Sequence, residues 1–76
     1  MNNFFNADVP VVYQKAILTR FLIHLEKKNE DNLFEDYAHY DVFFSSEVQK
    51  KMTSIFISLD VYSEKVRKLF EEYGLI

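Results

Sequence analysis

The second half of the chain has the apolar spacing of a helix. Between residues 33 and 73, apolar side chains recur every four or three positions, which keeps them on one helical face. From Val48 onward the two intervals alternate strictly, as in a heptad seam, and an extra four-residue step occurs around Phe44 and Val48. The simplest interpretation is one helix over about 32–73, roughly 60 Å long.

A competing interpretation breaks this long helix near Ser45. In the stretch FFSS, Ser45 or Ser46 precedes Gln49, which resembles a helix capping box. The neighbouring segment DVFFSS is also rich in serine and in residues that favour extended structure. Both interpretations remain open from the sequence.

A first helix is predicted over about 10–28. Asp8 is expected to cap it, with Pro10 in its first turn, and the polar segment KKNEDN (27–32) is expected to end it. Gly74 is expected to end the second helix in a left-handed conformation. The first helix has a broad apolar face, made by Val11, Tyr13, Ile17, Leu18, Phe21, Leu22 and Leu25.

The lengths of the two helices predict an oligomer. A first helix of about 30 Å covers only half of a helix twice as long, and a large uncovered apolar stripe is rare on a monomer. The first helix also carries a second, narrower apolar stripe on its other side. The predicted fold is therefore all-α, a hairpin of two helices that pairs as a dimeric four-helix bundle. The residues expected at the dimer interface are Val12, Ala16, Ile23, Ile55, Phe56, Leu59, Tyr62, Val66, Leu69 and Phe70.

Composition agrees with one small helical domain over residues 1–76. The chain is 49% hydrophobic and has no cysteine, so it needs a core and has no disulfide to stabilise it. It has only one proline and one glycine, and the 63 residues between them contain neither helix breaker. Oligomerisation is a common way for a domain this small to gain stability.

Four short stretches stand out together: the run YDVFFSSEVQKKMT, the LD of Leu59 and Asp60, the KV of Lys65 and Val66, and the VP of Val9 and Pro10. With these stretches the chain resembles the YvfG-like family of small bacterial helical proteins. The resemblance spans about residues 9–68 with a gap near Leu59. It implies a two-helix hairpin that forms a homodimer, and it implies no catalytic residue.

Charge and aromatic residues concentrate in the middle of the chain. Residues 30–47 carry six acidic side chains and no lysine or arginine, although the whole chain has a net charge of only −3. Such a block favours a basic protein partner over nucleic acid. Its aromatic side chains suit protein contacts. The candidate partner surface comprises Phe34, Glu35, Asp36, Tyr37, His39, Tyr40, Asp41 and Phe43. The alternative is that the tyrosines belong to the apolar seam and the acids to its solvated side.

Other chemistry has weaker support in the sequence. Glu35, Asp36 and His39 share a helical face, and with His24 they would suit a divalent ion, but a solvated acidic face is the better explanation. The single glycine excludes a glycine-rich phosphate loop. The basic groups near Lys50 and Lys65 are interleaved with acids, so nucleic-acid binding is not expected. We therefore expect no catalytic residue, metal or cofactor.

The predicted function is a small non-enzymatic module for protein–protein interaction or regulation, acting as a homodimer. The alternative is an acidic inhibitor or immunity-type antagonist of a basic protein, of the phage or mobile-element kind. A third hypothesis is a metal- or nucleic-acid-binding accessory protein. The start MNNFF lacks the basic region of a secretory signal, and no apolar run approaches the ~20 residues of a membrane span, so a cytoplasmic location without membrane association is expected.

Overall fold

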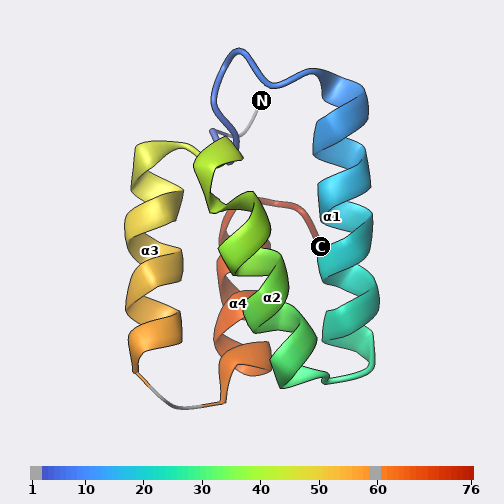
Figure 1. Cartoon of the computed structure of the whole chain (residues 1–76), viewed down its shortest axis with the longest axis vertical. Coiled ribbons are helices and arrows are strands. Elements are labelled where there is room, and N and C mark those ends of the chain that lie inside the picture. Colours follow the sequence, from blue (N-terminus) through green and yellow to red (C-terminus); the bar gives the residue numbers. More distant parts are fainter. Residues whose placement is uncertain (1–2, 59–60) are drawn as a thin grey trace.

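The described part of the chain folds into four α-helices and one short 3-10 helix. The computed structural model describes residues 3–58 and 61–76. In chain order the elements are α1 (Val11–Glu26), α2 (Glu30–Tyr40), η1 (Asp41–Phe43), α3 (Ser46–Ile57) and α4 (Tyr62–Glu72) (Figure 1). The all-α class predicted from the sequence is confirmed.

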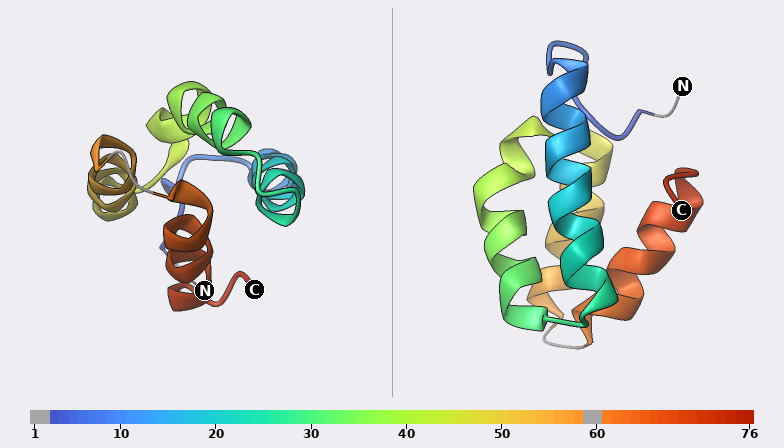
Figure 2. Two further views of the ribbon diagram at one scale, coloured as in Figure 1. Left: turned by 90° about the horizontal axis from the view of Figure 1, so that it is seen from below. Right: turned by 90° about the vertical axis from the view of Figure 1, so that its right-hand side faces the viewer.

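The four helices surround one core within a single chain. Seen end-on, α1 and α3 lie on opposite sides of the molecule, with α2 and α4 on the other two sides (Figure 2). The principal extents are 31 × 22 × 22 Å. The described residues of one chain therefore supply four helices by themselves, whereas the sequence predicts two helices from each of two copies. Within the described residues, no helix is long and apolar enough to cross a membrane.

The continuous helix predicted over about 32–73 is wrong, and the alternative break near Ser45 is confirmed. The Ser45 hydroxyl accepts a hydrogen bond from Val48 N, so Ser45 caps α3. Gln49 Nε2 donates to Phe44 O at 2.9 Å. α3 ends at Ile57 and α4 begins at Tyr62, an interruption that the apolar pattern did not predict.

The apolar seam is nevertheless real, because its members meet inside the protomer. Phe44, Val48, Met52 and Val66 are completely buried. Folding the seam into three shorter helices brings its parts against one another, and a second copy is then not needed to cover them.

Four residues assigned to the dimer interface consequently lie in the core of one protomer. They are Phe56, Val66, Leu69 and Phe70, all no more than 4% exposed. Ile55 and Tyr62 also pack against this core, and Leu59 lies outside the described residues. Val12, Ala16 and Ile23 remain exposed on α1, as the amphipathic pattern predicts.

A left-handed residue turns the chain sharply from α1 into α2. Lys28 has φ +52°, and Asn29 N donates to His24 O at 3.0 Å across the turn. Asn29 then caps α2, because its side chain accepts from Asn32 N at 3.1 Å. At α1, Pro10 occupies the capping position itself and Asp8 lies outside it.

Gly74 ends α4 as predicted. Its φ is +72°, and Leu75 N donates to Phe70 O at 2.9 Å. The same end of α4 is tied to α3, because Lys51 Nζ lies 2.5 Å from Glu72 Oε2 and 5.1 Å from the centre of the Tyr73 ring. The hydrogen bond to Glu72 raises the pKa of the Lys51 ammonium above its ordinary range.

The N-terminal segment completes the core. Asn6 N donates to Phe43 O and Ser45 N donates to Phe4 O, so the segment pairs with the chain between η1 and α3. The Phe4 side chain is completely buried. Its ring lies 5.2–5.4 Å from the rings of four other aromatic residues: Phe5, Phe44, Phe70 and Tyr73.

Glu30, the first residue of α2, caps α4. Its two carboxylate oxygens accept from Tyr62 N at 2.9 Å and from Ser63 N at 3.0 Å. The residue before α4 is Val61, whose side chain has no oxygen with which to cap the helix. A carboxylate from another element therefore satisfies the first amides of α4 and complements its dipole.

Replacing Phe4 by alanine is expected to lower the free energy of unfolding by about 3–5 kcal/mol, because the ring fills the centre of the aromatic cluster. Urea denaturation followed by circular dichroism measures the change. Phe34→Ala removes the same atoms from a side chain that is 45% exposed, so its loss should be clearly smaller. Equal losses would show that the N-terminal segment does not complete the core.

Glu30→Gln is expected to destabilise the protein by about 1 kcal/mol, because the amide nitrogen cannot accept a hydrogen bond from the start of α4. Asp31→Asn is the matched control, since it removes the neighbouring negative charge from the same first turn of α2. Thermal melts of both variants compare the two effects. An Asp31→Asn loss as large as that of Glu30→Gln would assign the effect to the α2 dipole instead.

Candidate functional site

The predicted acidic and aromatic surface does not form one patch. Phe34 and Tyr37 turn toward α3 and α4, where the Tyr37 ring stacks on Phe56 with 4.7 Å between centroids and Phe34 meets Phe56 edge-on. Tyr40 and Phe43 turn instead toward α1. Glu35 and His39 are exposed, and Asp41 is half-buried. The eight predicted partner-contact residues are thus distributed over different sides of α2 and η1.

Asp36 is not on the surface, contrary to the prediction. Its side chain is only 4% exposed and faces α1. Arg20 Nε donates to Asp36 Oδ1 at 3.2 Å, and His24 Nδ1 lies 2.5 Å from Asp36 Oδ2. A buried carboxylate needs such partners, because burial of an unpaired charge is very costly.

A signal for this cluster is present in the sequence. Arg20 and His24 are four residues apart, so they lie on one face of α1, and they interrupt its longest apolar run. Polar residues that interrupt an apolar run indicate a partner on a neighbouring element. The identity of that partner depends on how α2 is rotated about its axis, which the sequence does not state.

The hydrogen-bond partners of the two histidines show which ring nitrogen donates a proton. A carboxylate and a carbonyl accept only, so His24 Nδ1 donates to Asp36 and His39 Nδ1 donates to Glu35 O, at 3.0 Å. Nε2 is then the nitrogen that each imidazole has left for other contacts. In the neutral ring this nitrogen is an acceptor.

Arg20, Asp36 and the two histidines belong to the lining of a polar pocket of about 240 Å³ between α1 and α2. Arg20 and His24 come from α1, and the other lining residues come from α2. Within the described part of the chain, no group of three or more His, Cys, Asp or Glu side chains is arranged to hold a metal ion. The complete lining comprises Arg20, His24, Asn32, Glu35, Asp36, His39 and Tyr40.

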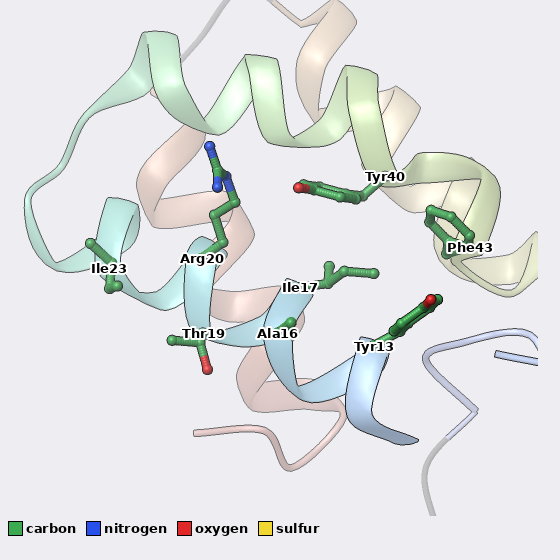
Figure 3. A pocket seen from close by; sticks show the side chains of 8 residues that line it. All are labelled: Tyr13, Ala16, Ile17, Thr19, Arg20, Ile23, Tyr40 and Phe43. Atoms are coloured by element: carbon green, nitrogen blue, oxygen red, sulfur yellow. The ribbon is translucent and has the colours of Figure 1, made fainter. Parts of the chain in front are cut away.

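A second, apolar groove of about 500 Å³ adjoins this pocket along α1. Figure 3 shows Tyr13 and Phe43 close together at one end, Ala16 in the middle and Ile23 at the other end. Arg20 and Tyr40 line both the groove and the polar pocket. The full lining of the groove is Tyr13, Ala16, Ile17, Thr19, Arg20, Ile23, Tyr40 and Phe43.

An exposed stripe runs along α1 and shares three of its four residues with the lining of the groove. It is formed by Val12, Ala16, Thr19 and Ile23, whose spacing of four, three and four is that of a heptad seam. Val12 is 67% exposed and Ile23 is 46% exposed. The Thr19 hydroxyl donates to Lys15 O at 2.8 Å, so the one polar side chain of the stripe is satisfied within its own helix.

No family model, curated protein or solved structure matches this chain.

Asp36→Asn is expected to lower the free energy of unfolding by about 2 kcal/mol. The amide loses one of the two acceptor oxygens, and the loss stays below the 3–5 kcal/mol of a fully buried pair because the Arg20 side chain is 59% exposed. Glu35→Gln, one residue earlier on the exposed side of α2, should change stability by less than about 0.5 kcal/mol. Chemical denaturation of both variants makes the comparison, and equal effects would contradict the assigned role of Asp36.

Proposed function

We propose that this protein is a small non-enzymatic interaction module that acts as a homodimer through α1. The observation that carries the proposal is the exposed stripe of Val12, Ala16, Thr19 and Ile23. The fold leaves this stripe in solvent, whereas it buries the opposite face of the same helix. An unpartnered heptad-like stripe that lines an apolar groove is the usual form of a helix-binding surface.

The stripe is complementary to a copy of itself. When two α1 helices pack antiparallel about a two-fold axis, Val12 of one copy faces Ile23 of the second copy and Ala16 faces Thr19. The large side chains then lie at the two ends and the small ones at the centre, where the helices approach each other most closely. A two-fold interface requires this kind of self-complementarity.

The groove extends the apolar part of the same face. Tyr13 is 57% exposed at its edge, and a tyrosine supplies a large contact area at low conformational cost. Together the groove and the stripe offer an apolar centre bordered by charged residues, which is the common anatomy of a protein–protein interface.

Val12→Glu is expected to weaken the dimer at least about tenfold, because every dimer would contain two buried carboxylates. Val12 is in the first turn of α1, where a negative charge suits the helix dipole, so the protomer should remain folded. Sedimentation velocity over a concentration series measures the dissociation constant.

Ile57→Lys is the matched control for Val12→Glu. It also replaces an exposed apolar residue by a charge of the sign that its helix end favours, and it lies on α3, away from the stripe; Ile57 is 72% exposed. This variant should dimerise as the parent does. A parent protein that remains monomeric at about 100 μM, or equal weakening by both substitutions, would contradict the proposal.

A further inference from the structure

The polar pocket between α1 and α2 is built around a fixed guanidinium. Asp36 is buried and engages Arg20 through Nε. The two terminal Nη groups of Arg20 are therefore available to a ligand, and their planar fork matches a carboxylate in geometry. Asp36 thus acts as a positioning residue that holds Arg20 at the pocket.

The opposite wall of the pocket presents acceptors. Glu35 contributes an exposed carboxylate from α2, and His39 contributes Nε2 because its Nδ1 donates to Glu35 O. On the α1 side, His24 has its Nε2 left for other contacts, since its Nδ1 is bound to Asp36. The ligand must consequently offer an acceptor to Arg20 and a donor to Glu35 and His39.

Charge and size narrow the class of ligand. The formal charges of Arg20, Asp36 and Glu35 sum to −1, which opposes a free anion, while Arg20 opposes a simple cation. A small zwitterion avoids both penalties, because each of its charges meets the opposite sign. The volume of about 240 Å³ accommodates a small amino acid.

We propose that this pocket binds a free α-amino acid, with its carboxylate on the Arg20 fork and its ammonium group between Glu35 and the His39 imidazole. The site is independent of the dimer proposed above. A dimer without amino-acid binding, or amino-acid binding by a monomer, would leave one proposal standing and remove the other.

Glycine is the probe for this site, because it carries both charged groups and no side chain. The full chain is titrated with glycine at about pH 7, and the imidazole and backbone amide resonances are followed by NMR. The resonances of His24 and His39 should shift and reach saturation. Acetate carries only the carboxylate of glycine, and methylammonium carries only its ammonium group. Glycine should bind at least about tenfold more tightly than either, because its second contact forms within the bound complex.

Two variants test the walls of the pocket separately. Arg20→Lys keeps the charge but loses the bidentate fork, and it should weaken glycine at least about fivefold. His39→Ala removes an exposed side chain whose hydrogen bond to Glu35 O stays within α2, so the fold should be kept while glycine binding falls. Lys15→Gln removes an exposed charge from the same helix outside the pocket and should bind glycine as the parent does.

Any one of the following outcomes would overturn the proposal of an amino-acid site. Acetate binding as tight as glycine binding would identify an oxyanion site, and equally tight methylammonium binding would identify a cation site. A Lys15→Gln loss as large as the Arg20→Lys loss would reduce the effect to general charge. The titration extends to about 100 mM glycine, far above a dissociation constant of about 1 mM. The absence of any saturable shift over this range would show that the pocket does not bind an amino acid.

Discussion

The burial of Phe44 is the contact on which the rest of this structure depends. Phe44 is completely buried, and its ring lies 5.2 Å from Phe4, 5.5 Å from Phe5 and 5.8 Å from Phe21. It sits at the point where the chain leaves η1 and approaches α3. The N-terminal segment, α1 and the start of α3 therefore converge on one side chain, and a straight helix through this position would separate them.

The break at Phe44 also determines the surface that α1 and α2 share. Because the chain turns here, α2 is a short helix that packs beside α1 with Asp36 facing Arg20 and His24. The three side chains form a charged cluster next to an aromatic core. Their hydrogen bonds restrict the rotation of α2 about its axis, since any other rotation would bury a carboxylate without partners.

Two different surfaces result from this one helix pair. The apolar groove and the polar pocket adjoin each other, and Arg20 and Tyr40 contribute to both. In the groove the alkyl part of Arg20 serves as a wall, and in the pocket its guanidinium is held by Asp36. Side chains that carry both an apolar stem and a polar head allow two such neighbouring surfaces to share residues.

The sequence by itself determined three features. Apolar spacing determined the helical class and the exposed stripe on α1, and the single glycine determined the left-handed end at Gly74. These features depend on neighbours in the sequence, so local periodicity and backbone freedom are sufficient to predict them. The continuity of the second helix was predicted wrongly, because a heptad seam shows which residues need a partner and not whether that partner belongs to the same chain. The role of Phe4 was missed, because a short apolar segment before the first helix has no period that connects it to a core 40 residues away.

The tertiary structure alone decided which polar residues are functional candidates. Asp36 and Glu35 are adjacent acids on one helix, and the sequence offered no reason to separate them. Packing against α1 buried Asp36 beside Arg20 and His24 and left Glu35 exposed. The physical reason is that the cost of burying a charge depends on partners from another element, and only the folded chain brings those partners within hydrogen-bond distance.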